Sequence, residues 1–164
     1  MKKYLFILIL LISFSCYTNN STTTYTPLSQ SEFLDSPFGF DENIANFQSI
    51  TKPKFNTEKV LRKNKHYPEK TDTIYKFKYK KSSVYFYKTH LNQEFLLAGK
   101  IIDKQIQLKN GIHIGILKTD FTSRFNEELN WQNDSLELIG EGTKYTFIFE
   151  NDHLSKIKID NYFD

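Results

Sequence analysis

The sequence predicts an α+β domain in which antiparallel β-meanders pack against one or two short helices on one face. Several short segments alternate apolar and polar residues, and polar turns separate them. Two further segments place apolar residues at helical spacing. Roughly 130 residues remain after the N-terminal leader and its polar tail, which is enough for one domain with its own core.

The chain begins with a segment that has the composition of an export signal. Lys2 and Lys3 precede an apolar run that ends at Ile12, and the only cysteine, Cys16, follows four residues later. The run is about half as long as a bilayer-spanning helix requires. Residues 13–16 resemble the lipobox of bacterial lipoproteins, in which a small residue, here Ser15, precedes the lipidated cysteine. The resemblance implies that residues 1–15 are removed and that Cys16 carries lipid. The alternative is an ordinary cleaved signal with a chance cysteine.

Residues 17–31 are polar and lack the apolar side chains that a packed segment needs. We therefore expect residues 16–31 to be a lipidated cysteine and its flexible tether, and residues 32–164 to be the domain. With Cys16 modified, no disulfide is expected in the domain. The acidic run that accompanies surface export in some lipoproteins does not follow Cys16. The expected location is the outer membrane, on the periplasmic side.

The elements of the domain are expected in the following order. A first helix, with Asp41 as its N-cap, is predicted by the apolar spacing of Phe40, Ile44 and Phe47. A basic connection at 52–70 follows it. A strand at 74–79 faces Tyr75, Phe77 and Tyr79 to one side and Lys76 and Lys78 to the other. A turn at 80–83 precedes further strands at 84–87, 94–102 and 105–108.

A second helix, with Thr119 as its N-cap, is predicted by the four-residue spacing of Leu117, Phe121, Phe125 and Leu129. The last strands are expected at 136–139, 144–149 and 154–159, with a turn at 150–153.

A diverged tandem repeat of one helix and three strands is a further interpretation of this order. Asp72-Thr73-Ile74 and Asp134-Ser135-Leu136 each open a predicted strand, 62 positions apart, and Tyr85 falls on Phe147 at that offset. The units would be 32–104 and 105–164. Chance similarity between amphipathic strands is the alternative.

Residues 111–125, GIHIGILKTDFTSRF, are followed by strands that include FIFENDHLSKI at 147–157. This pattern resembles small periplasmic proteins built from helix-plus-meander units, among them the SmpA/OmlA-type outer-membrane assembly lipoproteins and the β-lactamase inhibitory proteins. It lacks a clear second helix in each unit. The resemblance implies a binding protein that works through a sheet surface, and not an enzyme.

Charge is unevenly distributed along the chain. Residues 52–81 contain 11 basic and 3 acidic residues, a local net charge of +8, whereas residues 120–164 contain 4 basic and 10 acidic residues, a net charge of −6. Such a domain attracts a partner of opposite charge in a salt-sensitive way, unless the runs are only solvated faces. The candidate contacts for an acidic partner are Lys63, Lys65, Lys76, Lys78, Lys80 and Lys81. Trp131 is either a core plug after the second helix or an exposed anchor for a partner.

No residue pattern for catalysis is present. His66, His90, His113 and His153 lack the spacing of a metal site, and no nucleophile motif or glycine-rich phosphate loop occurs. We therefore expect no catalytic residue, no metal and no cofactor. Thr73 and Ser135 lie in tripeptides that resemble periplasmic O-glycosylation acceptors, although a strand-opening turn explains them more simply.

The expected function is that of a lipid-anchored, non-catalytic periplasmic binding protein, such as an inhibitor, an immunity protein or an envelope-assembly accessory. Its partners would be the membrane, through Cys16, and an acidic protein or anionic envelope polymer, through the basic sheet face. No nucleic-acid partner is expected, because the chain is exported. The alternative function is a carrier or structural lipoprotein that encloses a small apolar ligand in an aromatic-lined pocket.

Overall fold

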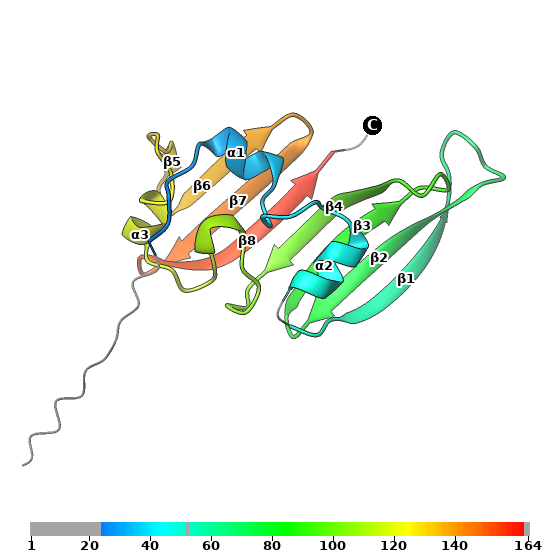
Figure 1. Ribbon diagram of the computed structural model, residues 1–164, viewed down its shortest axis with the longest axis horizontal. Helices are drawn as coiled ribbons and strands as arrows, with labels where there is room; N and C mark the ends of the chain where they lie inside the picture. The colour runs from blue at the N-terminus through cyan, green and yellow to red at the C-terminus, as the bar shows by residue number, and fades with distance from the viewer. Residues whose placement is uncertain (1–23, 52, 163–164) are drawn as a thin grey trace, which may run out of the picture.

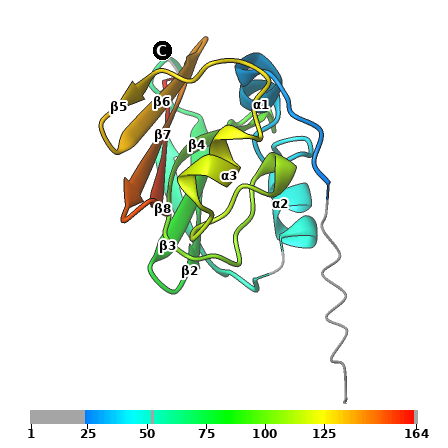
Figure 2. The same ribbon diagram turned by 90° about the vertical axis from the view of Figure 1, so that its left-hand side faces the viewer.

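The computed structural model describes residues 24–51 and 53–162 of the chain. Within these residues, eight strands form one antiparallel sheet in the order β1-β2-β3-β4-β8-β7-β6-β5. Three α-helices lie on one face of the sheet (Figure 1, Figure 2). We call this the covered face and the opposite one the open face. The predicted α+β class and the antiparallel meanders are confirmed, with far more sheet than helix.

The first half of the sheet is a meander of four strands, namely β1 (Asn56–Lys63), β2 (Thr71–Tyr79), β3 (Ser82–Lys88) and β4 (Glu94–Ile101). The basic connection expected at 52–70 contains β1, a strand that was not predicted. This strand lies at the sheet edge and is almost wholly exposed, so it lacks the alternation of buried and exposed residues that marks a strand. The turn between β2 and β3 is only Lys80 and Lys81, shorter than the predicted 80–83.

The second half contributes β5 (Trp131–Gln132), β6 (Ser135–Gly140), β7 (Thr143–Glu150) and β8 (His153–Asn161). The predicted strand at 105–108 is wrong. Gln107 makes only an isolated bridge to His113, and the backbone N–H of Leu108 donates to the carbonyl of Ile112 at 2.8 Å. The segment closes on itself around a short 3-10 turn, η1 (Lys109–Gly111), and therefore does not join the sheet.

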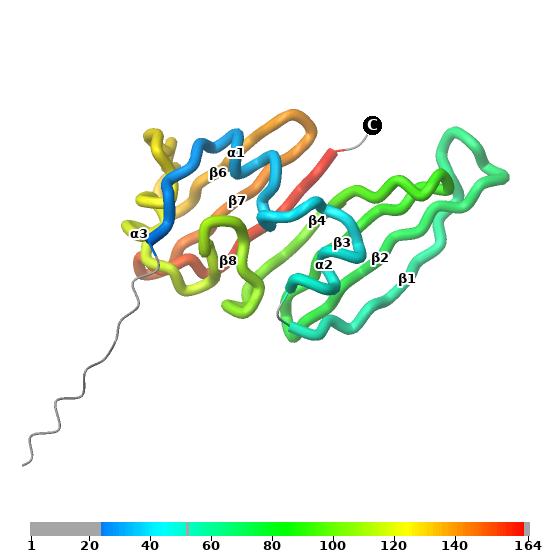
Figure 3. Tube along the Cα trace, viewed as in Figure 1, coloured from blue at the N-terminus to red at the C-terminus, as the bar shows by residue number. Residues whose placement is uncertain are grey.

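The two halves join where β4 pairs with β8, so the last strand of each half lies at the middle of the sheet (Figure 3). In this ladder Gly99 lies opposite Ile159. A Cβ atom on Gly99 would lie 2.8 Å from Cδ1 of Ile159. The glycine therefore lets the isoleucine side chain fill the junction.

The helix α1 (Gln30–Asp35) was not predicted. Its N-cap is Ser29, which forms a reciprocal capping box with Glu32, and the helix buries Phe33. The helix α2 (Ile44–Ile50) matches the predicted first helix, but its N-cap is Asn43 and not Asp41. The side-chain oxygen of Asn43 accepts a hydrogen bond from the backbone N–H of Asn46 at 2.8 Å.

The helix α3 (Lys118–Thr122) is much shorter than the predicted second helix. Thr119 lies inside it and is not its N-cap, a position that Leu117 occupies without a capping side chain. The chain leaves the helix before Phe125, which instead forms a parallel bridge with Leu28. Phe121, Phe125 and Leu129 are buried but do not lie on one helix, whereas Leu117 is exposed. The four-residue apolar spacing therefore does not mark a single helical face.

Residues 24–31 belong to the expected tether, but they pack against the domain. Leu28 is buried and exchanges backbone hydrogen bonds with Arg124 and Asn126 at 3.0 and 3.1 Å. The Tyr25 ring lies 3.8 Å from the guanidinium of Arg124. The packed chain therefore begins before residue 32. The expected leader and Cys16 lie outside the described residues.

Aromatic rings fill the core between the helices and the sheet. Phe47 contacts four other rings at centroid distances of 5.0 to 5.4 Å, those of Phe38, Phe55, Phe77 and Phe86. Under the other half, Phe121 contacts Phe147 and Phe149 at 4.9 and 5.4 Å. No helix among the residues that the structure describes is long and apolar enough to cross a bilayer.

Candidate functional site

The helices leave the open face of the sheet uncovered (Figure 2). Strand alternation determines which side chains reach it. Phe77 on β2 is buried on the covered face, so its neighbours Lys76 and Lys78 lie on the open face. The predicted placement of these two lysines, opposite the aromatic side of the strand, agrees with the structure.

The strand register brings further lysines onto the same face. Lys78 lies opposite Ser83, Ser83 opposite Lys100, and Lys100 opposite Lys158. Lys156, two residues before Lys158 on β8, lies on the same side of that strand. We call the set of Lys76, Lys78, Lys100, Lys156 and Lys158 the lysine face.

Lys100 and Lys158 are the centre of this lysine face. They are directly opposite each other in the β4–β8 ladder, and both are exposed. Side chains at such positions have Cβ atoms about 5 Å apart, and like charges there destabilise a sheet. Within the described residues, no carboxylate lies within 4.0 Å of the ammonium groups of Lys100, Lys156 or Lys158. These three lysines therefore take part in no ion pair among the described residues.

The other two lysines of the lysine face have partners within the sheet. Lys78 forms a half-exposed ion pair with Glu58 at 2.6 Å. The ammonium of Lys76 lies 5.3 Å from the centroid of the Tyr85 ring, and interaction with the Tyr85 side chain raises the pKa of Lys76. Both lysines are thus held in place by partners within the sheet.

The remaining predicted contact residues lie elsewhere. Lys80 and Lys81 form the β2–β3 turn, and the ammonium of Lys80 lies 3.4 Å from Asp103. Lys63 is at the end of β1, in register with Thr71, and Lys65 lies in the following loop. These four lysines therefore lie at strand ends and in loops, outside the lysine face.

Trp131 lies at the opposite edge of the sheet from β1 and is half-buried. Its ring contacts Phe149 at 5.2 Å and Phe121 at 6.0 Å, and the ammonium of Lys118 lies 4.5 Å from it. These contacts place Trp131 at the margin of the core, as the core-plug interpretation expects.

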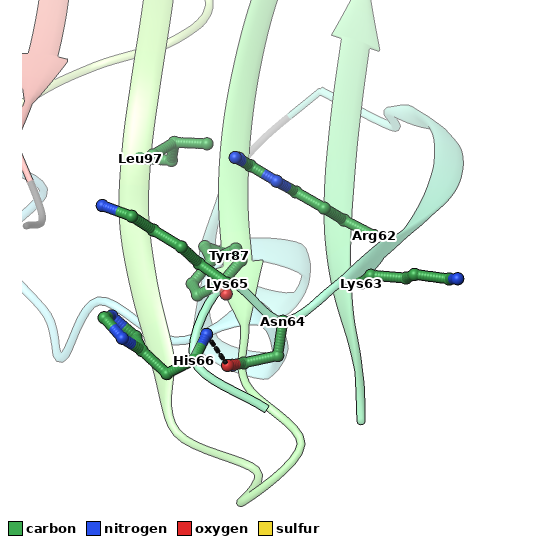
Figure 4. Close-up of a pocket in the computed structure, with 7 residues that line it drawn as sticks. All are labelled: Arg62, Lys63, Asn64, Lys65, His66, Tyr87 and Leu97. Carbon is green, nitrogen blue, oxygen red and sulfur yellow. Dashed lines mark hydrogen bonds between the residues drawn. The ribbon is translucent and has the colours of Figure 1, made fainter. Parts of the chain in front are cut away.

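A hollow of about 160 Å³ lies at one end of the open face (Figure 4). Arg62 and Lys65 point across it toward Leu97, whereas Lys63 points away. The Asn64 side-chain oxygen accepts a hydrogen bond from the backbone N–H of His66 at 2.9 Å and so fixes the loop that forms its rim. The hollow combines basic and apolar walls.

A buried carboxylate supports the strands beside this hollow. Asp72 accepts hydrogen bonds from the Tyr87 hydroxyl, the Asn64 amide at 2.8 Å and the backbone N–H of His90 at 2.8 Å. Burial raises the pKa of Asp72, but these hydrogen bonds outweigh it and hold the pKa below its usual value. The ring of His90 lies 3.4 Å away. These hydrogen bonds connect Asp72 on β2 to Tyr87 on β3 and to the loops that contain Asn64 and His90.

Comparison of the chain with protein-family models, with curated proteins and with solved structures finds no match. The resemblances to lipoproteins and to the SmpA/OmlA type therefore remain predictions.

The sequence did not identify Lys100, Lys156 and Lys158 as site residues. Each lies next to a buried isoleucine on its strand, and this alternation places the lysines on the outer face. Their convergence depends on the pairing of β4 with β8, which are separated by more than 50 positions in the sequence. In the part of the chain that the structure describes, no three acidic, histidine or cysteine side chains are grouped as a metal site requires.

Proposed function

We propose that this chain is a lipid-anchored, non-catalytic binding protein of the bacterial envelope that holds an acidic partner on its lysine face. The partner is an acidic protein or an anionic envelope polymer. The observation on which the proposal depends is the unpaired juxtaposition of Lys100 and Lys158 across the β4–β8 ladder. A sheet that keeps two like charges opposite each other gains stability when an anionic group binds between them.

The position of the N-terminal segment supports a partner on the side away from the membrane. Asn110 donates a hydrogen bond to the carbonyl of Thr26 at 3.0 Å, and Leu28 bridges Phe125, so residues 24–28 lie with the helices (Figure 2). Eight residues from Cys16 to Thr24 extend at most about 28 Å. Lipid on Cys16 would therefore hold the covered side nearer to the membrane and present the lysine face to the periplasm.

The packing of the core favours this proposal over a carrier of apolar ligands. A carrier needs aromatic side chains around its ligand, whereas the rings of Phe47 and Phe121 contact neighbouring rings at 4.9 to 5.4 Å. The described hollows lie at the surface and have mixed polar walls.

We further propose that the two halves of the sheet are a diverged repeat of one helix and four strands. Two features of the described chain support this. The strand order places β1 to β4 and β5 to β8 as mirrored sets. A register shift also interrupts both the β3–β4 and the β7–β8 ladders. The earlier offset of 62 needs adjustment, because it aligns Tyr85 on the open face with Phe147 on the covered face.

The proposal is tested with the full chain and a matched pair of variants. Envelope extract is passed over immobilised protein, and bound material is measured between about 0.05 and 0.5 M salt. We expect the amount of bound material to fall as the salt concentration rises. At low salt, the double variant Lys100→Gln/Lys158→Gln is expected to bind about tenfold more weakly than the unchanged chain. Lys54→Gln removes an exposed lysine outside the lysine face and is expected to bind normally. Binding that is insensitive to salt and unchanged in the double variant would contradict the proposal.

Anchoring is tested separately by mass spectrometry of Cys16 in protein from native membranes. We expect diacylglycerol on the sulfur and an N-terminus at Cys16. An unmodified sulfur, or an intact Met1, would contradict the lipid-anchor part of the proposal and leave the binding part standing.

A further inference from the structure

The strand β1 (Asn56–Lys63) leaves one edge of the sheet open. It is the first strand in the sheet order, and seven of its eight residues are exposed. Two apolar side chains, Val60 and Leu61, are 53% and 72% exposed on its opposite faces. The far edge is different, because β5 contains only two residues. An exposed edge strand of this length is a template for pairing with another chain.

The hydrogen-bond pattern identifies which backbone groups of β1 point outward. Asn64 continues the β1–β2 register opposite Lys70, and its N–H donates to the carbonyl of Lys70 at 3.0 Å. In an antiparallel ladder, hydrogen-bonded and non-bonded pairs alternate. The even-numbered residues 56–62 therefore bond to β2. The odd-numbered residues Thr57, Lys59, Leu61 and Lys63 direct their N–H and C=O groups to the open edge.

The charges of β1 specify what fits this edge. Lys59, Arg62 and Lys63 are exposed and lack an ion pair within the described residues, whereas Glu58 is already paired with Lys78. Cross-strand neighbours of opposite charge stabilise a sheet, and like charges destabilise it. A second copy of this chain would place two strands of equal positive net charge side by side. An acidic strand is the complementary occupant.

The hollow beside Arg62 adds a place for one side chain of such a strand. Arg62 lies opposite Asp72 in the ladder, so it is on the open face, and it points with Lys65 across the hollow (Figure 4). A residue paired with Arg62 on an added strand would extend toward this same face. A carboxylate there would contact both basic groups.

We propose that β1 receives an extended acidic segment of a partner protein as a ninth strand of the sheet. This inference rests on the proposed function in one respect, namely that the partner is acidic. It narrows that partner to a polypeptide that supplies backbone hydrogen bonds to Thr57, Lys59, Leu61 and Lys63. Main-chain pairing gives the affinity, and the side chains opposite Lys59, Arg62 and Lys63 give the specificity.

The test uses the octapeptide TEEVVEKT, which in antiparallel register places glutamate opposite Lys59, Arg62 and Lys63 and valine opposite Val60 and Leu61. Amide hydrogen exchange of the full chain in neutral detergent is followed by NMR with and without the peptide. We expect the amides of residues 57, 59, 61 and 63 to exchange freely at first and to slow at least about tenfold with the peptide. The even-numbered amides are protected in both states. The peptide TEEPPEKT has equal charge but cannot complete a strand, and it is expected to leave the odd-numbered amides unprotected.

Two variants separate backbone pairing from side-chain contact. Leu61→Pro removes one outward N–H without removing a β1–β2 hydrogen bond, and it is expected to weaken peptide binding about tenfold. Leu61→Thr keeps the N–H and is expected to bind within about threefold of the unchanged chain. Equal binding by Leu61→Pro and Leu61→Thr would overturn the inference, as would slowed exchange that appears without peptide and grows with protein concentration, since a second copy would then occupy the edge.

The same experiment distinguishes this inference from the proposed function. Lys100→Gln/Lys158→Gln leaves β1 intact and is expected to retain protection of the odd-numbered amides by the peptide. Polyglutamate is applied to Leu61→Pro, in which pairing at the β1 edge is weakened, and serves there as the probe for the lysine face. Loss of peptide protection with retained polyglutamate binding overturns the inference alone, and the reverse result overturns the lysine face alone.

Discussion

The Tyr87 hydroxyl donates a hydrogen bond to the buried carboxylate of Asp72, and this contact ties β3 to β2 on the open face. Asp72 is 1% exposed and also accepts hydrogen bonds from Asn64 and His90. The carboxylate therefore holds together the ends of β1, β2 and β3 and the loop that follows β3.

Replacing Asp72 is expected to destabilise the domain strongly. Asp72→Ala leaves three partly buried donors without their acceptor, and we expect the free energy of unfolding to fall by about 2–4 kcal/mol. Chemical denaturation of both proteins measures it. Asp134→Ala is the control, since Asp134 directly precedes β6 in the second half but is exposed. Its surface ion pair with Lys118 at 3.5 Å contributes little, so we expect a change within about 0.5 kcal/mol.

The same contact makes stability depend on acid. The pKa of Asp72 lies below its unfolded value, so its stabilisation is complete above the unfolded pKa and disappears as pH falls through the folded pKa. We expect Asp72→Asn to unfold with a smaller dependence on pH below about pH 4 than the unchanged chain. An equally steep acid transition in both proteins would show that other carboxylates govern it.

Glu42 has the opposite pH behaviour. Burial raises its pKa to about 7, and its Oε1 atom has no hydrogen-bond partner among the described residues. A raised folded pKa gives stability that is present below the unfolded value and is lost as pH rises through the folded value. We therefore expect the free energy of unfolding to fall between about pH 4.5 and pH 7.

The variant Glu42→Gln is expected to remove this loss. At pH 8 it avoids a buried charge, so we expect it to be more stable than the unchanged chain by on the order of 3 kcal/mol. At pH 4 the two proteins are expected to have nearly equal stability. Thermal unfolding monitored across pH measures the difference. Parallel pH curves for the two proteins would show that Glu42 does not cause the slope.

Sequence patterns predicted the strands that have one apolar and one polar face. They missed the elements whose formation depends on contacts with distant parts of the chain. Strands β2 and β7 were found because aromatic residues such as Phe77 and Phe147 recur there at every second position. Strand β1 was missed because its place at the edge leaves its residues exposed. The lysine face was half predicted. Lys76 and Lys78 follow from local alternation, whereas Lys100 and Lys158 meet only through a ladder between distant segments.

The junction of the two halves depends on Gly99. Because a Cβ atom there would lie 2.8 Å from Cδ1 of Ile159, we expect Gly99→Ala to lower the free energy of unfolding by about 1–2 kcal/mol. Ile159→Val removes that Cδ1 atom. We therefore expect the double variant to be more stable than the sum of the two single effects predicts. Urea denaturation of all four proteins measures this coupling, and strictly additive effects would contradict the contact.

Lys158 provides a prediction in which stability and binding change in opposite directions. Lys158→Glu replaces a like-charge pair across the β4–β8 ladder by an opposite-charge pair with Lys100. Opposite charges at such positions contribute about 0.2–1 kcal/mol, so we expect a small gain in the free energy of unfolding. The same change removes one cation from the lysine face and introduces an anion, so binding of polyglutamate is expected to weaken by at least about tenfold.

The salt dependence of the two measurements provides the control. Screening reduces both the repulsion between Lys100 and Lys158 and the attraction for a polyanion. We therefore expect the stability difference between Lys158→Glu and the unchanged chain to shrink at high salt, together with the difference in binding. Lys54→Glu makes the same change of charge at an exposed position outside the lysine face, and we expect it to alter neither quantity by a comparable amount. If Lys158→Glu destabilised the domain, or if Lys54→Glu weakened polyglutamate binding equally, the net charge of the protein rather than this pair would explain its affinity for anions.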